Sequence, residues 1–173
     1  MPYKIGILAY DRSGNRYVKW CEQCTNVIRS PKQQVFMCSN KSIGTYMPCG
    51  KEEGVHWYVD HVQNKGIYYE IRGFAFCRGD SHFKYRQTLL LVDQNHKAYE
   101  FEVHSEERVD VAAAFPEQHF LYYTGFKCYV LCDALECGMK YDMIIRLTNQ
   151  FEQKDVIDVA TGHKLEINLE QRE

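Results

Sequence analysis

Four cysteines in the first third of the chain could together hold a metal ion. Cys21 and Cys24 form a Cys-x-x-Cys pair, and Cys38 and Cys49 follow with ten residues between them. Two thiolates at the first spacing can bind one tetrahedral Zn²⁺, and two later cysteines can complete such a site. A zinc ribbon would have a second Cys-x-x-Cys in place of the wider pair. One hypothesis is therefore a zinc-stabilised interaction module, and the other is a protein with no cofactor and free thiols.

Free, buried thiols are the expected state of the eight cysteines as a set. The N-terminal apolar stretch is broken by charge within about ten residues, so no secretory signal region is recognised. Disulfide frameworks belong mainly to small secreted chains, and this chain can build a core of ordinary size. A redox role for Cys21 and Cys24 would need a helix directly after the pair, and the sequence predicts none there.

A serine in a polar segment is the strongest candidate nucleophile. Ser81 lies in the sequence Gly79-Asp80-Ser81-His82, which has a faint likeness to the nucleophile block of serine esterases. A catalytic serine needs a base, an orienting acid and oxyanion donors held in one geometry. The remaining parts of that signature are missing from the chain. We keep a Ser81 hydrolase as an alternative and expect a polar loop between strands, in a protein that is not an enzyme.

Two pairs of aromatic residues could form a platform for a sugar. A flat ring can stack on the apolar face of a pyranose while polar neighbours bind its hydroxyl groups, and most tyrosines on strands simply pack with the hydroxyl at the edge. The candidate ligand-binding residues are Trp57, Tyr58, Tyr122 and Tyr123.

Composition excludes several classes of protein. The chain has 173 residues, 45% of them hydrophobic and 25% charged, with a formal net charge of −2. These values are typical of one globular domain, and the chain lacks the excess of Lys and Arg that most nucleic-acid-binding proteins have. No apolar stretch approaches the roughly 18 residues of a membrane-spanning helix. We therefore expect a cytoplasmic protein with no nucleic acid partner and no membrane span.

Alternation of apolar and polar residues predicts strands along most of the chain. Tyr99, Phe101 and Val103 share one face of such a strand, and 141–147 repeats the pattern. Hairpin turns are predicted at 93–96 and at 161–163. Two short helical turns are predicted, at 110–115 before a proline and at 132–137 before a glycine. Neither is long enough for a crossover helix, so we expect an all-β, mainly antiparallel fold of the β-sandwich or jelly-roll type.

The segment rich in turn residues between the first strands and the main strand cluster predicts a boundary. We expect residues 1–54 to form an N-terminal hairpin with cysteine-containing loops that packs on the main domain. Residues 55–173 are expected to form the β-sandwich itself.

Seven short blocks follow one another between residues 57 and 150. They are Val59-Asp60, Ile71-Arg72-Gly73-Phe74-Ala75-Phe76, Leu89–Val92, Tyr99-Glu100-Phe101, Arg108-Val109-Asp110-Val111, Thr124-Gly125-Phe126 and Gly138–Tyr141. In order and spacing this series resembles a β-sandwich accessory domain that accompanies bacterial glycosyltransferases and glycerophosphotransferases of cell-surface polysaccharide synthesis. Phe74, Val109 and Thr124 stand where that family has Trp, Pro and Ser.

The resemblance implies a context and no active site, because the matched residues belong to the framework. We therefore expect a non-catalytic bacterial module that binds a glycan, or a partner protein of the glycosyltransferase type, in cell-surface polysaccharide synthesis.

Overall fold

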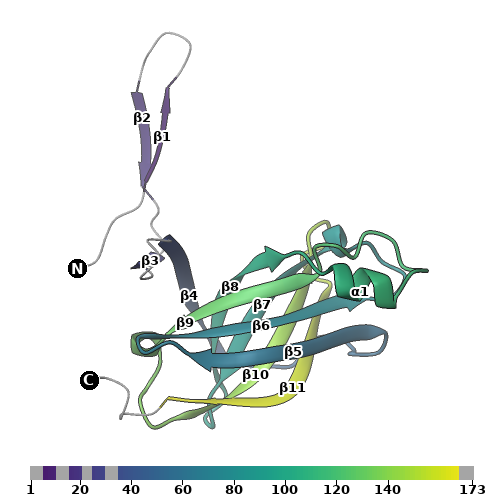
Figure 1. Ribbon diagram of the computed structural model, residues 1–173. Helices are drawn as coiled ribbons and strands as arrows, with labels where there is room; N and C mark the ends of the chain where they lie inside the picture. The colour runs from purple at the N-terminus through teal and green to yellow at the C-terminus, as the bar shows by residue number, and fades with distance from the viewer. Residues whose placement is uncertain (1–5, 11–15, 21–24, 30–34, 168–173) are drawn as a thin grey trace.

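The computed structural model describes residues 6–10, 16–20, 25–29 and 35–167, and within them nearly all regular structure is β-strand. Figure 1 shows the arrangement. The elements are β1 (Gly6–Tyr10), β2 (Arg16–Trp20), β3 (Thr25–Arg29), β4 (Val35–Thr45), β5 (Val55–Asn64), β6 (Tyr68–Cys77), η1 (His82–Lys84), β7 (Tyr85–Val92), β8 (Lys97–Glu106), α1 (Val109–Ala114), β9 (Gly125–Leu131), η2 (Cys132–Ala134), β10 (Lys140–Asn149) and β11 (Val156–Glu166).

Seven of these strands form the continuous path of one strongly curved, nine-stranded sheet. Its order is β11-β10-β7-β8-β9-β6-β5, and every neighbouring pair is antiparallel. The sheet bends until β5 and β11, its two ends, come into contact, so it nearly closes on itself (Figure 1). The prediction of an all-β, mainly antiparallel fold is confirmed.

The concave side of the sheet encloses a single main core. Each of the seven strands of the continuous path contributes side chains to it, at every second residue as the pleat requires. Burying one such aliphatic or aromatic side chain stabilises the fold by about 1.5–3 kcal/mol. One buried representative from each strand, in chain order, is Val59, Ile71, Leu89, Phe101, Cys128, Ile145 and Val159.

Strand β4 joins the main sheet beside β8. Residues Asn40–Thr45 of β4 pair with the first half of β8, and β9 pairs with the second half of the same edge. β3 pairs with β4, whereas β1 and β2 form a two-stranded sheet of their own. The predicted boundary at residue 54 stays a prediction, and β4 is a strand before that point that is hydrogen-bonded to the main sheet.

The local predictions differ in outcome. The turn at 93–96 does connect β7 to β8, and α1 and η2 lie at the two predicted helical turns. The predicted hairpin turn at 161–163 is wrong, because β11 continues through it and pairs with β10 on both sides. Three residues of β11 face one residue of β10 there, which is a bulge. The Thr161 hydroxyl donates to the Met143 carbonyl at 2.7 Å and fixes it.

Helix α1 covers part of the convex side of β6. Val111 of the helix and Leu121 of the following loop are buried against Phe76. Phe115 completes this small cluster by an edge-on ring contact with Phe76, with a centroid separation of 5.2 Å. The cluster anchors the loop 115–124, which leads to one end of the sheet.

Candidate functional site

Strands β7 and β8 separate from each other at one end of the sheet. Their pairing runs from Val92↔Ala98 to Thr88↔Glu102 and ends there. Before Thr88, β7 stays paired with β10, and after Glu102, β8 pairs with β9. We call the opening between Tyr85–Gln87 and Val103–Ser105 the β7–β8 gap.

The Gln87 side chain forms hydrogen bonds to other parts of the sheet at the place where β7 and β8 no longer pair. The Gln87 Nε2 donates to the carbonyl of Ala75 at 2.8 Å and to that of Thr124 at 3.0 Å. The Gln87 amide thereby connects β7 to β6 and to the residue before β9. Both of its N–H groups are used, which fixes the orientation of the amide, since a flipped amide would place its oxygen against two carbonyl oxygens.

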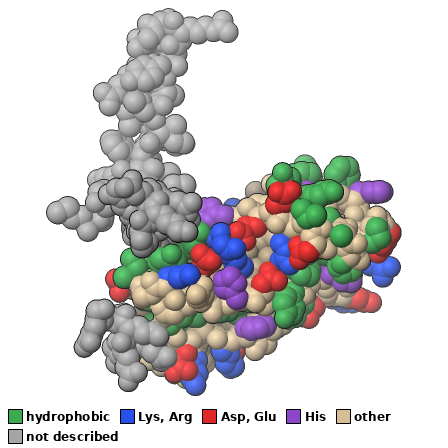
Figure 2. All heavy atoms as spheres, viewed as in Figure 1, with side chains coloured by type: hydrophobic (Ala, Val, Ile, Leu, Met, Phe, Trp, Pro, Cys, Tyr) green, Lys and Arg blue, Asp and Glu red, His purple; other side chains and the backbone are tan. Residues whose placement is uncertain are grey.

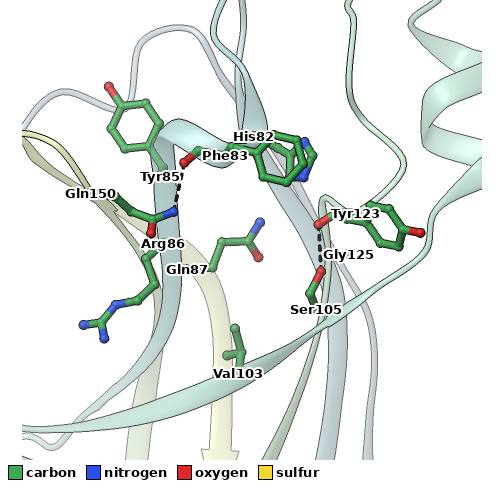
Figure 3. A pocket seen from close by; sticks show the side chains of 10 residues that line it. All are labelled: His82, Phe83, Tyr85, Arg86, Gln87, Val103, Ser105, Tyr123, Gly125 and Gln150. Carbon is green, nitrogen blue, oxygen red and sulfur yellow. Dashed lines mark hydrogen bonds between the residues drawn. The ribbon is translucent and has the colours of Figure 1, made fainter.

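A cavity of about 400 Å³ lies at the gap. Gln87 and Val103 have the same strand parity as the core residues Leu89 and Phe101, whereas Arg86 has the opposite parity. All three nonetheless line the cavity, so residues of both strand parities contribute to it at the gap. Figure 3 shows Gln87 among the other lining residues, with Val103 below it in the view.

Aromatic rings form the outer part of this cavity. His82 and Phe83 of η1 lie with their ring centroids 3.7 Å apart, and the ring of Tyr123 lies 6.3 Å from that of His82. Phe83 and Tyr123 are 60% and 53% exposed, so part of each ring is accessible to a ligand. Burial lowers the pKa of His82, partly offset by a hydrogen bond with the backbone of Phe120, and therefore favours the neutral ring.

The cavity also contains hydroxyl and amide groups. The Ser105 hydroxyl donates to the Tyr123 carbonyl at 3.1 Å. Gln150, in the turn after β10, donates from Nε2 to the Phe83 carbonyl at 2.9 Å. These bonds, drawn as dashed lines in Figure 3, tie Tyr123 to β8 and Phe83 to the turn after β10.

Unpaired buried polar atoms concentrate at the same place. In the described part of the chain three buried side-chain nitrogen or oxygen atoms have no hydrogen-bond partner: His82 Nδ1, Gln87 Oε1 and Arg72 Nε. Arg72 Nε lies 2.9 Å from the Glu70 carboxylate, so its charge is compensated. The other two belong to residues that line the cavity. Folded proteins satisfy nearly all buried polar atoms, so these two atoms are candidates for hydrogen bonds with a ligand.

The structure separates the four aromatic residues predicted to bind a ligand. Tyr123 lines the cavity, and its neighbour Tyr122, equally exposed at 53%, does not. Trp57 and Tyr58 are adjacent on β5 and point to opposite sides of the sheet. Trp57 packs against the main core, and Tyr58 is 57% exposed. The four residues therefore do not form one platform, and Tyr123 is the member at the cavity.

Ser81 lies beside the cavity as the cap of η1. Its hydroxyl accepts a hydrogen bond from the Phe83 backbone N–H at 3.3 Å. This contact stabilises the start of the short helix, as serine side chains commonly do. It gives Ser81 a role in positioning His82 and Phe83.

The four candidate zinc ligands fall mostly outside what the structure describes. Cys21 and Cys24 are not among the described residues, and for Cys38 only its place in β4 is described. Cys49 is partly buried, and its thiol contacts the Met47 carbonyl at 3.5 Å. Within the described ranges no group of three or more His, Cys, Asp or Glu side chains is placed to hold a metal ion. The zinc site stays a prediction.

A second, charged hollow is lined by residues of β5, β6, the end of β8 and the segment after it. Arg108 contacts Asp60 at 2.6 Å and Asp110 at 2.7 Å, and Lys127 contacts Glu106 at 2.7 Å. Figure 2 shows acidic, basic and histidine side chains interspersed over this side of the molecule. These charges compensate one another, so this face offers a weaker candidate site than the β7–β8 gap.

Family models, curated proteins and solved structures were compared with the chain, and none of them matches it. No helix in the described residues is long and apolar enough to cross a membrane.

Sequence reasoning missed His82, Gln87, Ser105 and Gln150 as parts of one cavity. One signal was present: Gln87 occupies a core-facing position next to the apolar run Leu89–Val92. A polar residue at such a position requires hydrogen-bond partners. The other three come together only because two strands separate, and no local pattern encodes that separation.

Proposed function

We propose that this chain is a non-catalytic module that binds a saccharide at the β7–β8 gap. The observation that carries the proposal is the combination of exposed rings and amide groups in one cavity. Tyr123 and Phe83 offer apolar faces, while Gln87 and Gln150 offer hydrogen-bonding groups beside them. Ligand sites are typically concave and mostly apolar, with a few polar groups that fix the orientation of the ligand.

The wider context is a proposal of the same kind. The resemblance of residues 57–150 to accessory domains of bacterial glycosyltransferases and glycerophosphotransferases is consistent with a glycan ligand. It also suggests a partner protein of the glycosyltransferase type, in cytoplasmic steps of cell-surface polysaccharide synthesis. The cavity is the part of this proposal that can be tested with the purified chain alone.

Titration with saccharides, followed by calorimetry and by NMR of the full chain, tests the proposal. We expect Tyr123→Ala to weaken binding about tenfold, which corresponds to roughly 1.4 kcal/mol of lost contact. Tyr122→Ala is the matched control, because Tyr122 is adjacent, equally exposed and outside the cavity. Its affinity should equal that of the unmodified protein.

Two results would contradict the proposal. One is the absence of binding to every saccharide at millimolar concentration. The other is an equal loss of affinity in both tyrosine variants, which would place the ligand elsewhere on the loop that contains them.

A further inference from the structure

The polar groups of the cavity share a chemical asymmetry. Gln87 uses both N–H groups on the Ala75 and Thr124 carbonyls, and its Oε1 has no partner. The Ser105 hydroxyl has one proton and donates it to the Tyr123 carbonyl. In both cases the protein itself consumes the donors and leaves oxygen lone pairs.

One further residue follows the same pattern, and Gln150 does not. Gln150 uses one N–H on the Phe83 carbonyl and keeps its second N–H as well as its oxygen, so it can bind a donor or an acceptor. The His82 ring bonds to the Phe120 backbone, and its Nδ1 has no partner. A neutral imidazole has one donor and one acceptor nitrogen, so a ring that donates to a backbone carbonyl keeps the acceptor.

Among the described residues that line the cavity, Arg86 is the one lysine or arginine. Its guanidinium lies 3.5 Å from the Glu102 carboxylate, and both side chains are more than half exposed. In Figure 3 it points away from Gln87 and Tyr123. The charge of Arg86 is therefore directed to the convex face, toward a compensating carboxylate, and not into the aromatic part of the cavity.

From this asymmetry we infer that the β7–β8 gap selects neutral saccharides by their hydroxyl donors and rejects acidic sugars such as uronates. The inference rests on the proposed function and specifies its ligand class. A hydroxyl group can donate to Gln87, Ser105 or His82, whereas a carboxylate brings only further lone pairs to them. The Gln87 Oε1 and His82 Nδ1 atoms are buried. A buried acceptor that faces another acceptor loses the hydrogen bonds each had with water, which costs about 1–3 kcal/mol.

Paired probes test this selection. Methyl glycosides of glucose, galactose and mannose are titrated next to the corresponding uronic acids at neutral pH. For a sugar that binds, we expect the uronate to bind at least tenfold more weakly. Ser105→Ala should weaken binding of the neutral sugar severalfold, because it removes one acceptor.

Arg86→Gln is the matched variant for the competing explanation, in which the arginine captures an anion. It should leave the preference for the neutral sugar over its uronate unchanged. A uronate that binds as tightly as its neutral counterpart, or a loss of that preference in Arg86→Gln, would overturn the inference while the proposed function stands. If neither kind of sugar binds, the proposed function fails and this inference fails with it.

Discussion

Arg146 and Asp158 form a two-pronged ion pair on neighbouring strands β10 and β11. The guanidinium Nε and Nη2 lie 2.7 and 2.8 Å from the two carboxylate oxygens, and the Asp158 side chain is 1% exposed. Asp158 also binds the chain before β5, because the Cys49 backbone N–H donates to its carboxylate at 3.1 Å and its own N–H donates to the Cys49 carbonyl at 2.9 Å. One buried carboxylate thereby joins three segments.

We expect Asp158→Ala to lower the free energy of unfolding by about 3–5 kcal/mol, because it leaves the largely buried Arg146 without its counter-charge. Urea unfolding measures the loss. Asp142→Ala is the control, since Asp142 pairs with Lys164 between the same two strands but both side chains are about 60% exposed. That change should cost less than about 1 kcal/mol. Similar losses in the two variants would show that the buried Arg146–Asp158 pair contributes no more to the free energy of unfolding than the exposed pair.

The two hydrogen bonds from the Gln87 amide to the Ala75 and Thr124 carbonyls should also stabilise the fold. Gln87→Leu has similar size but leaves the Ala75 and Thr124 carbonyls without their side-chain donor. We expect a loss of about 1–3 kcal/mol in the free energy of unfolding, measured by urea denaturation. Gln94→Leu, in the exposed turn between β7 and β8, should change stability by less than 0.5 kcal/mol in either direction, roughly the usual size for surface changes. A Gln87→Leu protein with the same free energy of unfolding as the unmodified protein would contradict a stabilising role of these two hydrogen bonds.

The strands were predictable from sequence because period-two alternation reports burial directly. Tyr99, Phe101 and Val103 do share one face of β8, toward the core. The turn predicted at 161–163 was wrong because Gly162, with φ +71, is equally suited to a hairpin turn and to a bulge. The pairing of β11 with β10 on both sides of the glycine decides between them, and that is a long-range property.

The candidate site was only partly predictable for the same reason. Tyr123 was singled out as an exposed aromatic residue, and it does line the cavity. Tyr122 and Tyr58 are also tyrosines and are similarly exposed, but they lie outside the cavity. What distinguishes Tyr123 from them is its position next to the β7–β8 gap. The gap results from a ladder that ends at Thr88↔Glu102, and apolar runs such as Leu89–Val92 give no signal of where a ladder ends.

Cys77 is expected to be unreactive in the folded protein. Burial raises the pKa of its thiol to about 11, and the thiolate is the nucleophile. At pH 8 its alkylation by iodoacetamide should be roughly a hundredfold slower than that of an unperturbed thiol, because two pKa units reduce the thiolate fraction by that factor. Peptide mapping by mass spectrometry measures this, with the partly exposed Cys49 as the internal comparison. Rapid labelling of Cys77 without denaturant would contradict the buried position.

Acid should weaken the ion-pair network around Arg108. Its guanidinium lowers the pKa of the Asp110 carboxyl to about 2, below the ordinary value of 3.8. A carboxyl whose pKa is lower in the folded state stabilises the fold above its unfolded pKa, and this contribution disappears as the pH falls through the folded pKa. The contribution of Asp110 is therefore complete above about pH 4 and is lost toward pH 2.

Because the Asp110 side chain is 67% exposed, the contribution should be less than about 1 kcal/mol. Urea unfolding at pH 2, 3, 4 and 5 compares the unmodified protein with Asp110→Asn. The difference in unfolding free energy should be largest at pH 5 and should shrink toward zero at pH 2. Asp60 binds the other side of the same guanidinium at 2.6 Å and stays in place in this variant, so Arg108 keeps a partner and its position. A difference that is constant with pH would show that the Asp110 carboxylate makes no charge-dependent contribution.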